Sequence, residues 1–305
     1  MGYPLWTPVT GPGMFGGSFM YSMGDNTIAV GLIAGLDFHY CDFNPQEALS
    51  LFKKTSFARQ YLKGGLVIEA GAKMIPEGGL NAIPRDPETD EIGQGNTVIL
   101  GDGAGFVNML QIKGLSNAIH SGMLAGDAIA KNLENPKNIA LAYTNLVEKS
   151  RIQKGMFEAR NFRQTFAKLG TTLGMPLSMF SDMLPAWEVE KDYKTMSGKK
   201  YPLKSRKPFD KATFTALAGT KHREDQPSHL TILDAGICQG KCSAKFHCPC
   251  ITFCPGGVYE AVQGVVKPAN PSNCLHCKTC QRKCPFDNIR WTVPEGGGGP
   301  RHKNM

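Results

Sequence analysis

The chain has 305 residues, of which 41% are hydrophobic, and a formal net charge of +8. That length and composition indicate a globular protein with roughly two domains. They exclude a bundle of membrane-spanning helices, because no run of about 20 mostly apolar residues is free of helix breakers, and they do not indicate nucleic-acid binding, because no aromatic residues are interleaved with the basic ones.

Antiparallel strands are expected near the N-terminus. Met1–Gly17 is interrupted by prolines, so we expect no export or transit signal there. Residues 14–40 then alternate short apolar runs with glycines, which predicts antiparallel strands joined by a turn at Asp25-Asn26. Residues 44–63 predict one helix that stops before Gly64-Gly65.

A strand, a glycine turn and a helix are predicted in the middle of the chain. Thr97–Leu100 has the pattern of a short buried strand, and glycines follow it at once in Gly101–Gly105. An amphipathic helix is expected from Gly114 to about Leu133, and further helix over residues 139–168.

Leu169–Trp187 has the length of a membrane span but contains two prolines and a charge, so it is expected to lie on a membrane surface rather than to cross it. An ordinary buried helix pair is the alternative. The side chains expected to enter the lipid are Leu173, Met175, Leu177, Met179, Phe180, Met183, Leu184 and Trp187. The basic segment Lys191–Lys211 follows, and is interpreted as a solvated connector or as a contact for anionic lipid or an acidic partner.

Nine of the ten cysteines lie between Cys238 and Cys284. Such clustering favours metal ligation over disulfides in a chain of this size. Cys274, Cys277, Cys280 and Cys284-Pro285 have the spacing of the bacterial ferredoxin motif, in which three thiolates bind one [4Fe–4S] cluster and the fourth binds another. The motif predicts an iron–sulfur site here.

The fourth ligand of the first cluster is expected at Cys254, which is also followed by proline. The predicted set is therefore Cys254, Cys274, Cys277 and Cys280. A zinc ribbon is the alternative, because Cys250-x3-Cys254 and Cys274-x2-Cys277 suit tetrahedral zinc, but zinc leaves Cys280 and Cys284 unexplained.

Cys284 then needs partners of its own. By the pseudo-symmetry of ferredoxins, Cys238, Cys242, Cys250 and Cys284 are candidates for a second cluster, although the spacing of the first three is irregular and Cys248 is left over. The alternative is that these are spare, reduced thiols.

The sequence resembles the C-terminal portion of the electron-transferring-flavoprotein ubiquinone oxidoreductase family, without the family's N-terminal FAD-binding half. The resemblance rests on three runs of sequence around the cysteines and extends along the chain. The runs are 254–260 (CPGGVYE), 273–280 (NCLHCKTC) and 289–300 (IRWTVPEGGGGP), with further similarity at 218–222, 225–231, 16–19 and 105–114.

The resemblance implies an α+β fold: the C-terminal part of a glutathione-reductase-like flavoprotein with a quinone-binding β-sheet domain, then a ferredoxin-like [4Fe–4S] domain. The expected parts are quinone-domain strands and helix (1–75), a second FAD-contacting segment (76–135), a helical, membrane-surface and basic connector region (136–225) and the iron–sulfur domain (226–305). Cys284 departs from the family, where an acidic residue is common at that position.

The resemblance also implies cofactor contacts. FAD contacts are expected from Gly101, Asp102, Gly103, Gly105, Phe106, Val107, Asn108, Lys113 and Gly114, and quinone contacts from Gly16, Gly17 and Phe19. No G-x-G-x-x-G turn follows a strand near the start of the sequence. We therefore expect FAD to be shared with a separate polypeptide that carries the N-terminal FAD-binding half.

The function implied is electron transfer from electron-transferring flavoprotein to ubiquinone, as an oxidoreductase in which the cofactors carry the chemistry and no residue is catalytic. An accessory or structural subunit of a larger respiratory complex is the alternative, and a ferredoxin-type carrier is a third. The expected place is peripheral, on the matrix face of the mitochondrial inner membrane or the cytoplasmic face of a bacterial inner membrane. His222 and His229 are expected to be structural.

Overall fold

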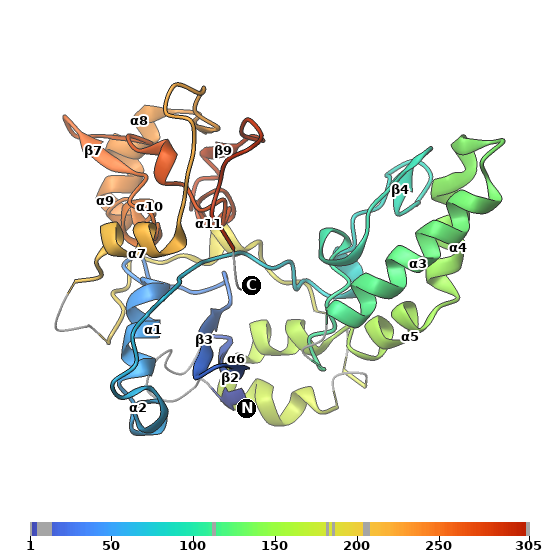
Figure 1. The fold of residues 1–305 in the computed structure, drawn as a ribbon, viewed down its shortest axis with the longest axis horizontal. Coiled ribbons are helices and arrows are strands. Elements are labelled where there is room, and N and C mark those ends of the chain that lie inside the picture. Colours follow the sequence, from blue (N-terminus) through green and yellow to red (C-terminus); the bar gives the residue numbers. More distant parts are fainter. Residues whose placement is uncertain are drawn as a thin grey trace. The chain divides into compact units, whose positions relative to one another are not determined.

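The computed structural model describes residues 2–4, 14–111, 114–180, 183–184, 187–203 and 208–302. The chain divides into two compact units (Figure 1). Unit 1 combines Met1–Met74 with Glu190–Met305, and unit 2 is formed by Ile75–Val189. Unit 1 is therefore built from two stretches that are distant in the sequence.

Unit 1 begins with an antiparallel sheet in the order β1-β2-β3. The strands are β1 (Gly2–Pro4), β2 (Gly16–Gly24) and β3 (Thr27–Ala34). Asp25 (φ 45°) and Asn26 (φ 56°) form the turn between β2 and β3 in the left-handed region, which short polar side chains tolerate. The predicted hairpin and its turn are confirmed.

The predicted helix over residues 44–63 is two helices, α1 (Pro45–Lys53) and α2 (Ser56–Leu62). The Asn44 side chain caps α1 by accepting from the backbone N–H groups of Gln46 and Glu47, and Thr55 caps α2 in the same way. Because Thr55 has extended backbone angles, it ends one helix and starts the next. The prediction of one continuous helix was wrong there.

The rest of unit 1 consists of short helices and two-stranded sheets. The helices are α7 (Lys211–Ala218), α8 (Ala235–Ile237), α9 (Ser243–Phe246), α10 (Pro249–Phe253) and α11 (Thr279–Lys283), with a π-helical turn over Cys238–Cys242. The antiparallel pairs are β6 (Leu230–Ile232) with β9 (Ile289–Trp291), and β7 (Glu260–Val262) with β8 (Val265–Lys267).

One buried cation joins the two stretches that make up unit 1. Lys283 is fully buried, and its Nζ donates to the Asp192 carbonyl (2.7 Å) and to Thr195 Oγ1 (2.9 Å). Nζ also lies 4.4 Å from the centre of the Phe38 ring. Burial lowers the pKa of Lys283 to about 8. The side chain thus ties α11 to residues from both stretches.

Unit 2 is mostly helical. Its helices are α3 (Leu115–Lys131), α4 (Ile139–Glu148), α5 (Arg151–Glu158) and α6 (Phe162–Ser178), and its hairpin pairs β4 (Gly93–Gln94) with β5 (Thr97–Val98). Its core includes Ile92, Phe106, Tyr143, Val147 and Met156. The predicted helix that starts after Gly114 is confirmed, and the predicted helical region 139–168 is divided among α4, α5 and α6, the last with a kink at Gly170 (φ 69°). The expected buried strand at Thr97–Leu100 covers only two residues and is not buried, since it lies in a two-stranded hairpin.

Candidate metal centre

The cysteine-rich part of unit 1 surrounds a small space. Four cysteines lie in its wall: Cys254 at the end of α10, Cys274 and Cys277 in the loop before α11, and Cys280 within α11. The remaining wall is mostly apolar and is formed by Leu230, Phe253, Pro255, Gly256, Val258, Tyr259, Leu275, Lys278 and Thr279. The structure thus brings together the four thiols predicted for the first cluster.

Unusual backbone angles shape the loops around this space. A Cβ on Gly256 would overlap the carbonyl oxygen of Asn273, so the turn after Cys254 requires glycine. His276 (φ 56°) and Lys278 (φ 58°) adopt left-handed angles on either side of Cys277. The His276 N–H donates to Cys274 Sγ at 3.4 Å, and hydrogen bonds of this kind stabilise thiolate ligands and tune cluster potentials.

Burial makes these thiols poor acids when they are free. It raises the pKa of Cys274 and of Cys280 to about 12, and it raises the pKa of Cys254 as well. Since thiolates are the ligands of iron and zinc, a bound cation must compensate for the apolar surroundings. The site therefore suits a positively charged centre that several thiolates share, rather than a reactive single thiol.

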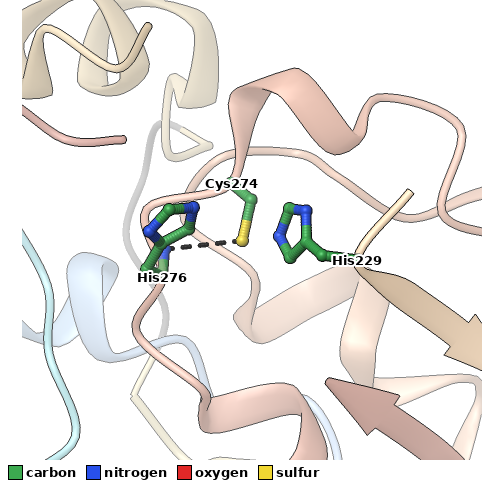
Figure 2. A group of neighbouring side chains, drawn as sticks. All are labelled: His229, Cys274 and His276. Carbon is green, nitrogen blue, oxygen red and sulfur yellow. Dashed lines mark hydrogen bonds between the residues drawn. The ribbon is translucent and has the colours of Figure 1, made fainter. Parts of the chain in front are cut away.

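The side chains of His229 and His276 lie on either side of the Cys274 sulfur (Figure 2). Ligand atoms of His229, Cys274 and His276 all lie within 4.8 Å of one another. Burial lowers the pKa of His276 to about 4 and also lowers the pKa of His229, so both rings are neutral at pH 7. Neither ring nitrogen of His229 has a hydrogen-bond partner among the described residues.

His222 completes this group, because its Nε2 lies 2.7 Å from His276 Nε2 and its Nδ1 lies 2.6 Å from the Ser272 carbonyl. The sequence predicted a structural role for His222 and His229 but did not single out His276. Its position between Cys274 and Cys277 in the motif was the available signal. The three rings pack against one another beside Cys274.

A second small space lies among five further cysteines of unit 1. Its wall contains Cys238, Cys242, Cys248, Cys250 and Cys284, together with Ile232, Pro249, Val266, Pro285 and Ile289. All five of these cysteines are buried. The structure therefore gathers the four thiols predicted for a second cluster, with Cys248 beside them.

The spacing of the thiols bears on which metal fits. Tetrahedral zinc with Zn–S bonds of about 2.3 Å holds its sulfurs about 3.8 Å apart. Within the described residues, His229, Cys274 and His276 are the only group of three potential ligands whose atoms lie within 4.8 Å of one another. Neither set of four cysteines converges to that extent. Thiols spread around a space suit a multi-iron cluster better than a single ion.

The segment predicted to contact FAD lies in unit 2. Gly101–Ala104 forms a 3-10 turn, and the Gly101 N–H donates to Ser121 Oγ at 3.0 Å. Phe106 is completely buried in the core of unit 2, and Asn108 Nδ2 donates to the Gly155 carbonyl at 2.9 Å. Phe106 and Asn108 therefore have structural contacts, and their FAD contacts stay a prediction.

Other predicted FAD residues surround the start of α3. Gly103, Gly105 and Val107 lie in the glycine turn and directly after it, and Gly114 precedes α3. A Cβ on Gly114 would lie 3.1 Å from Asp102 Oδ1, so the carboxylate approaches the helix start closely. Lys113 lies outside the described residues.

The predicted quinone residues Gly16, Gly17 and Phe19 lie on β2. Phe19 pairs with Gly31 of β3, and its ring covers that glycine, because a Cβ on Gly31 would overlap the ring. Tyr21 stacks beside it with ring centres 5.8 Å apart. Both aromatic side chains are exposed, so β2 presents an aromatic surface.

The C-terminal end of α6 and the residues after it expose apolar side chains. Met179 and Met183 are each 80% exposed and Phe180 is 58% exposed, and Leu173 and Leu177 are exposed as well. The side chain of Met175 lies outside the described residues. Among the described residues, no helix is both long enough and apolar enough to span a bilayer.

Two family models match the chain. The model for "Electron transfer flavoprotein-ubiquinone oxidoreductase, 4Fe-4S" covers residues 206–303, and the model for "ETF-QO, ubiquinone-binding" covers residues 1–75. The first contains every cysteine of both thiol sites, and the second contains β2 and β3. The predicted iron–sulfur and ubiquinone-binding domains are therefore confirmed at the level of the family.

Curated relatives match along nearly the whole of this chain. The chain is 34% identical over 323 residues to the mitochondrial electron transfer flavoprotein-ubiquinone oxidoreductase of Arabidopsis thaliana, covering 100% of this chain and 49% of that protein. It is 32% identical over 334 residues to a probable enzyme of that name in Acinetobacter baylyi (98% and 58%), and 34% identical over 322 residues to the Homo sapiens mitochondrial protein (95% and 51%).

The chain spans about half the length of these curated relatives. That coverage, together with the iron–sulfur model at residues 206–303, fits the C-terminal portion that the sequence predicted. The chain thus belongs to the electron transfer flavoprotein-ubiquinone oxidoreductase family.

Proposed function

We propose that the chain transfers electrons from electron-transferring flavoprotein to ubiquinone, through FAD and a [4Fe–4S] cluster bound by Cys254, Cys274, Cys277 and Cys280. The observation that carries this proposal is the apolar space with those four thiols in its wall. An iron–sulfur cluster takes up and releases single electrons, whereas ubiquinone takes up two electrons and two protons in all. The protein's part is to position the cofactors and exclude water.

We infer that FAD is shared with a separate polypeptide that carries the N-terminal FAD-binding half. Helix α3 supports this, because Leu115, Ile119 and Met123 lie at i, i+4 and i+8 and are all exposed. An apolar stripe of this kind on a helix beside the glycine turn needs another surface to cover it. Stoichiometric FAD in a soluble, purified chain without partner would refute the shared arrangement.

The function is tested by following the cluster in anaerobically purified protein. We expect reduced electron-transferring flavoprotein, with the FAD-carrying partner present, to reduce the cluster, and a water-soluble ubiquinone analogue to reoxidise it. Visible absorbance and electron paramagnetic resonance measure both steps. A cluster that dithionite reduces but the flavoprotein does not would instead support an accessory subunit of a larger respiratory complex.

The aromatic surface of β2 is the proposed quinone contact. Replacing Phe19 with alanine is expected to raise the quinone concentration needed for half-maximal reoxidation about tenfold, since an aromatic contact contributes roughly 1 kcal/mol or more. Tyr61→Ala is the matched control, because Tyr61 is exposed on α2 of the same unit. Equal effects of the two substitutions would remove β2 from the quinone site.

The exposed apolar side chains at the end of α6 support peripheral membrane association, on the matrix face in mitochondria or the cytoplasmic face in bacteria. Replacing Met179, Phe180 and Met183 with serine is expected to weaken binding to phospholipid vesicles at least about tenfold, because burial of each such side chain contributes up to roughly 1.5–3 kcal/mol. Vesicle cosedimentation measures the change.

The control for that experiment uses two other exposed apolar residues, Leu66 and Val293, which are 90% and 87% exposed and lie in unit 1. Leu66→Ser with Val293→Ser should leave vesicle binding unchanged. Binding that survives the triple substitution of Met179, Phe180 and Met183 would assign the membrane contact to another surface.

A further inference from the structure

We propose that this chain binds a second [4Fe–4S] cluster through Cys238, Cys242, Cys250 and Cys284. The four thiols lie in the wall of the second space, as Cys254, Cys274, Cys277 and Cys280 lie in the wall of the first. The other residues in that wall are apolar apart from Cys248, and the cysteines are buried. Both spaces thus offer the same kind of surroundings to a cluster.

Helices α10 and α11 contact each other and have the same construction. Each has cysteine at its second position, Cys250 in α10 and Cys280 in α11, and each ends in a Cys-Pro pair, at Cys254 and Cys284. The two capping cysteines have nearly equal backbone angles (φ −68°, ψ 115° and φ −62°, ψ 117°). The helices are therefore related by an internal pseudo-symmetry.

Each of the two helices supplies one cysteine to each space. Cys280 and Cys254 face the first space although they come from different helices, and Cys250 and Cys284 face the second. This crossed supply is the arrangement of two-cluster ferredoxins, in which the cysteine before proline binds the other cluster.

The same symmetry identifies the thiol that is not a ligand. Cys248 precedes α10 with φ 54°, and Lys278 precedes α11 with φ 58°, so the two residues occupy equivalent N-cap positions. Lys278 carries no thiol, so this position supplies no cysteine ligand to the first cluster. Cys248 is therefore the cysteine left over.

Hydrogen bonds to sulfur also recur in the second site. Asn288 is buried, and its backbone N–H donates to Cys284 Sγ at 3.3 Å while its Nδ2 donates to Cys238 Sγ at 3.4 Å. Nδ2 also donates to the Asp234 carbonyl at 2.7 Å, which fixes the amide. The sulfurs of Cys284 and Cys238 thus act as acceptors, as the sulfur of Cys274 does in the first site.

The remaining two ligands are placed by a helical turn. Cys238 and Cys242 lie four residues apart on the π-helical turn, so their side chains lie on nearly the same face and reach one space.

Each cluster gains one electron when it is reduced and loses one when it is oxidised, with no atom transferred. Two clusters would hold the two electrons that ubiquinone requires, and only this last step rests on the proposed function.

The test is an iron and acid-labile sulfide count on the full chain, purified anaerobically. We expect about eight iron and eight sulfide per chain, from two clusters of four. Cys284→Ala and, separately, Cys238→Ala should each reduce both counts to about half, while the electron paramagnetic resonance signal of the first cluster stays. Cys248→Ala is the control and should keep the full count.

Two positions are used because Cys284 also caps α11, whereas Cys238 does not. Four irons in the unaltered chain, zinc in place of half the iron, or a full count in both Cys284→Ala and Cys238→Ala would overturn the proposal. Loss of iron in Cys248→Ala would overturn the ligand set. Failure of the proposed quinone reaction would leave these counts unchanged, so the two proposals are tested separately.

Discussion

Replacing Cys280 with alanine should eliminate the first cluster. Only three thiolates remain around its space, and no other cysteine lies in that wall to take the fourth position. Loss of an outer hydrogen-bond partner already costs a metal site roughly 10–100-fold in affinity, so loss of a ligand should lower occupancy at least about 100-fold. Alanine is a good helix residue, so α11 should still form.

The measurement is the loss of four iron and four sulfide per chain together with the first cluster's resonance signal. Cys41→Ala is the matched control: Cys41 is buried in the same unit, but it lies in neither space, and its thiol donates to the Lys199 carbonyl. It should retain all the iron. An intact first cluster in Cys280→Ala would show that the ligand set is different.

Replacing Lys283 with alanine should destabilise unit 1 by about 3 kcal/mol. The substitution leaves a cavity in a fully buried position and removes the donor from the Asp192 carbonyl and Thr195 Oγ1. It also removes the cation from the Phe38 ring. The unfolding midpoint in urea, followed by circular dichroism on the cluster-loaded protein, measures the change.

Arg282→Ala is the control for Lys283, since Arg282 is the neighbouring residue of α11 but is exposed. Its effect should stay within about 0.5 kcal/mol. If Lys283→Ala were as mild as Arg282→Ala, the buried cation would not be what joins the two stretches of unit 1. Lys283→Met separates the charge from the packing, because it restores most of the side-chain volume.

Features with local causes were predictable from the sequence. The β2–β3 hairpin follows from the apolar alternation and from Asp25-Asn26, which tolerate left-handed angles. The convergence of Cys274, Cys277 and Cys280 was predictable because the spacing of the ferredoxin motif is set by one loop and one helical turn. Helix α3 was predictable from its periodicity alone.

Other features depend on segments that are distant in the sequence. The break between α1 and α2 depends on a single cap at Thr55, which a periodic pattern does not reveal. The approach of His229 to Cys274 and the burial of Lys283 against Phe38 join residues more than 40 positions apart. The equivalence of Cys248 and Lys278 became visible only from their backbone angles.

The divided course of unit 1 constrains how the protein is made. The Asn44 side chain bonds to the Thr252 carbonyl at 3.2 Å, and the Met74 N–H bonds to the Cys277 carbonyl at 3.2 Å. A ribosome must therefore synthesise all of unit 2, residues 75–189, before these partners of the first stretch emerge. Until the second stretch has been synthesised, residues 14–74 lack the partners that cover their apolar side chains in the folded unit. Chaperones therefore have their longest opportunity to bind this part of the nascent chain.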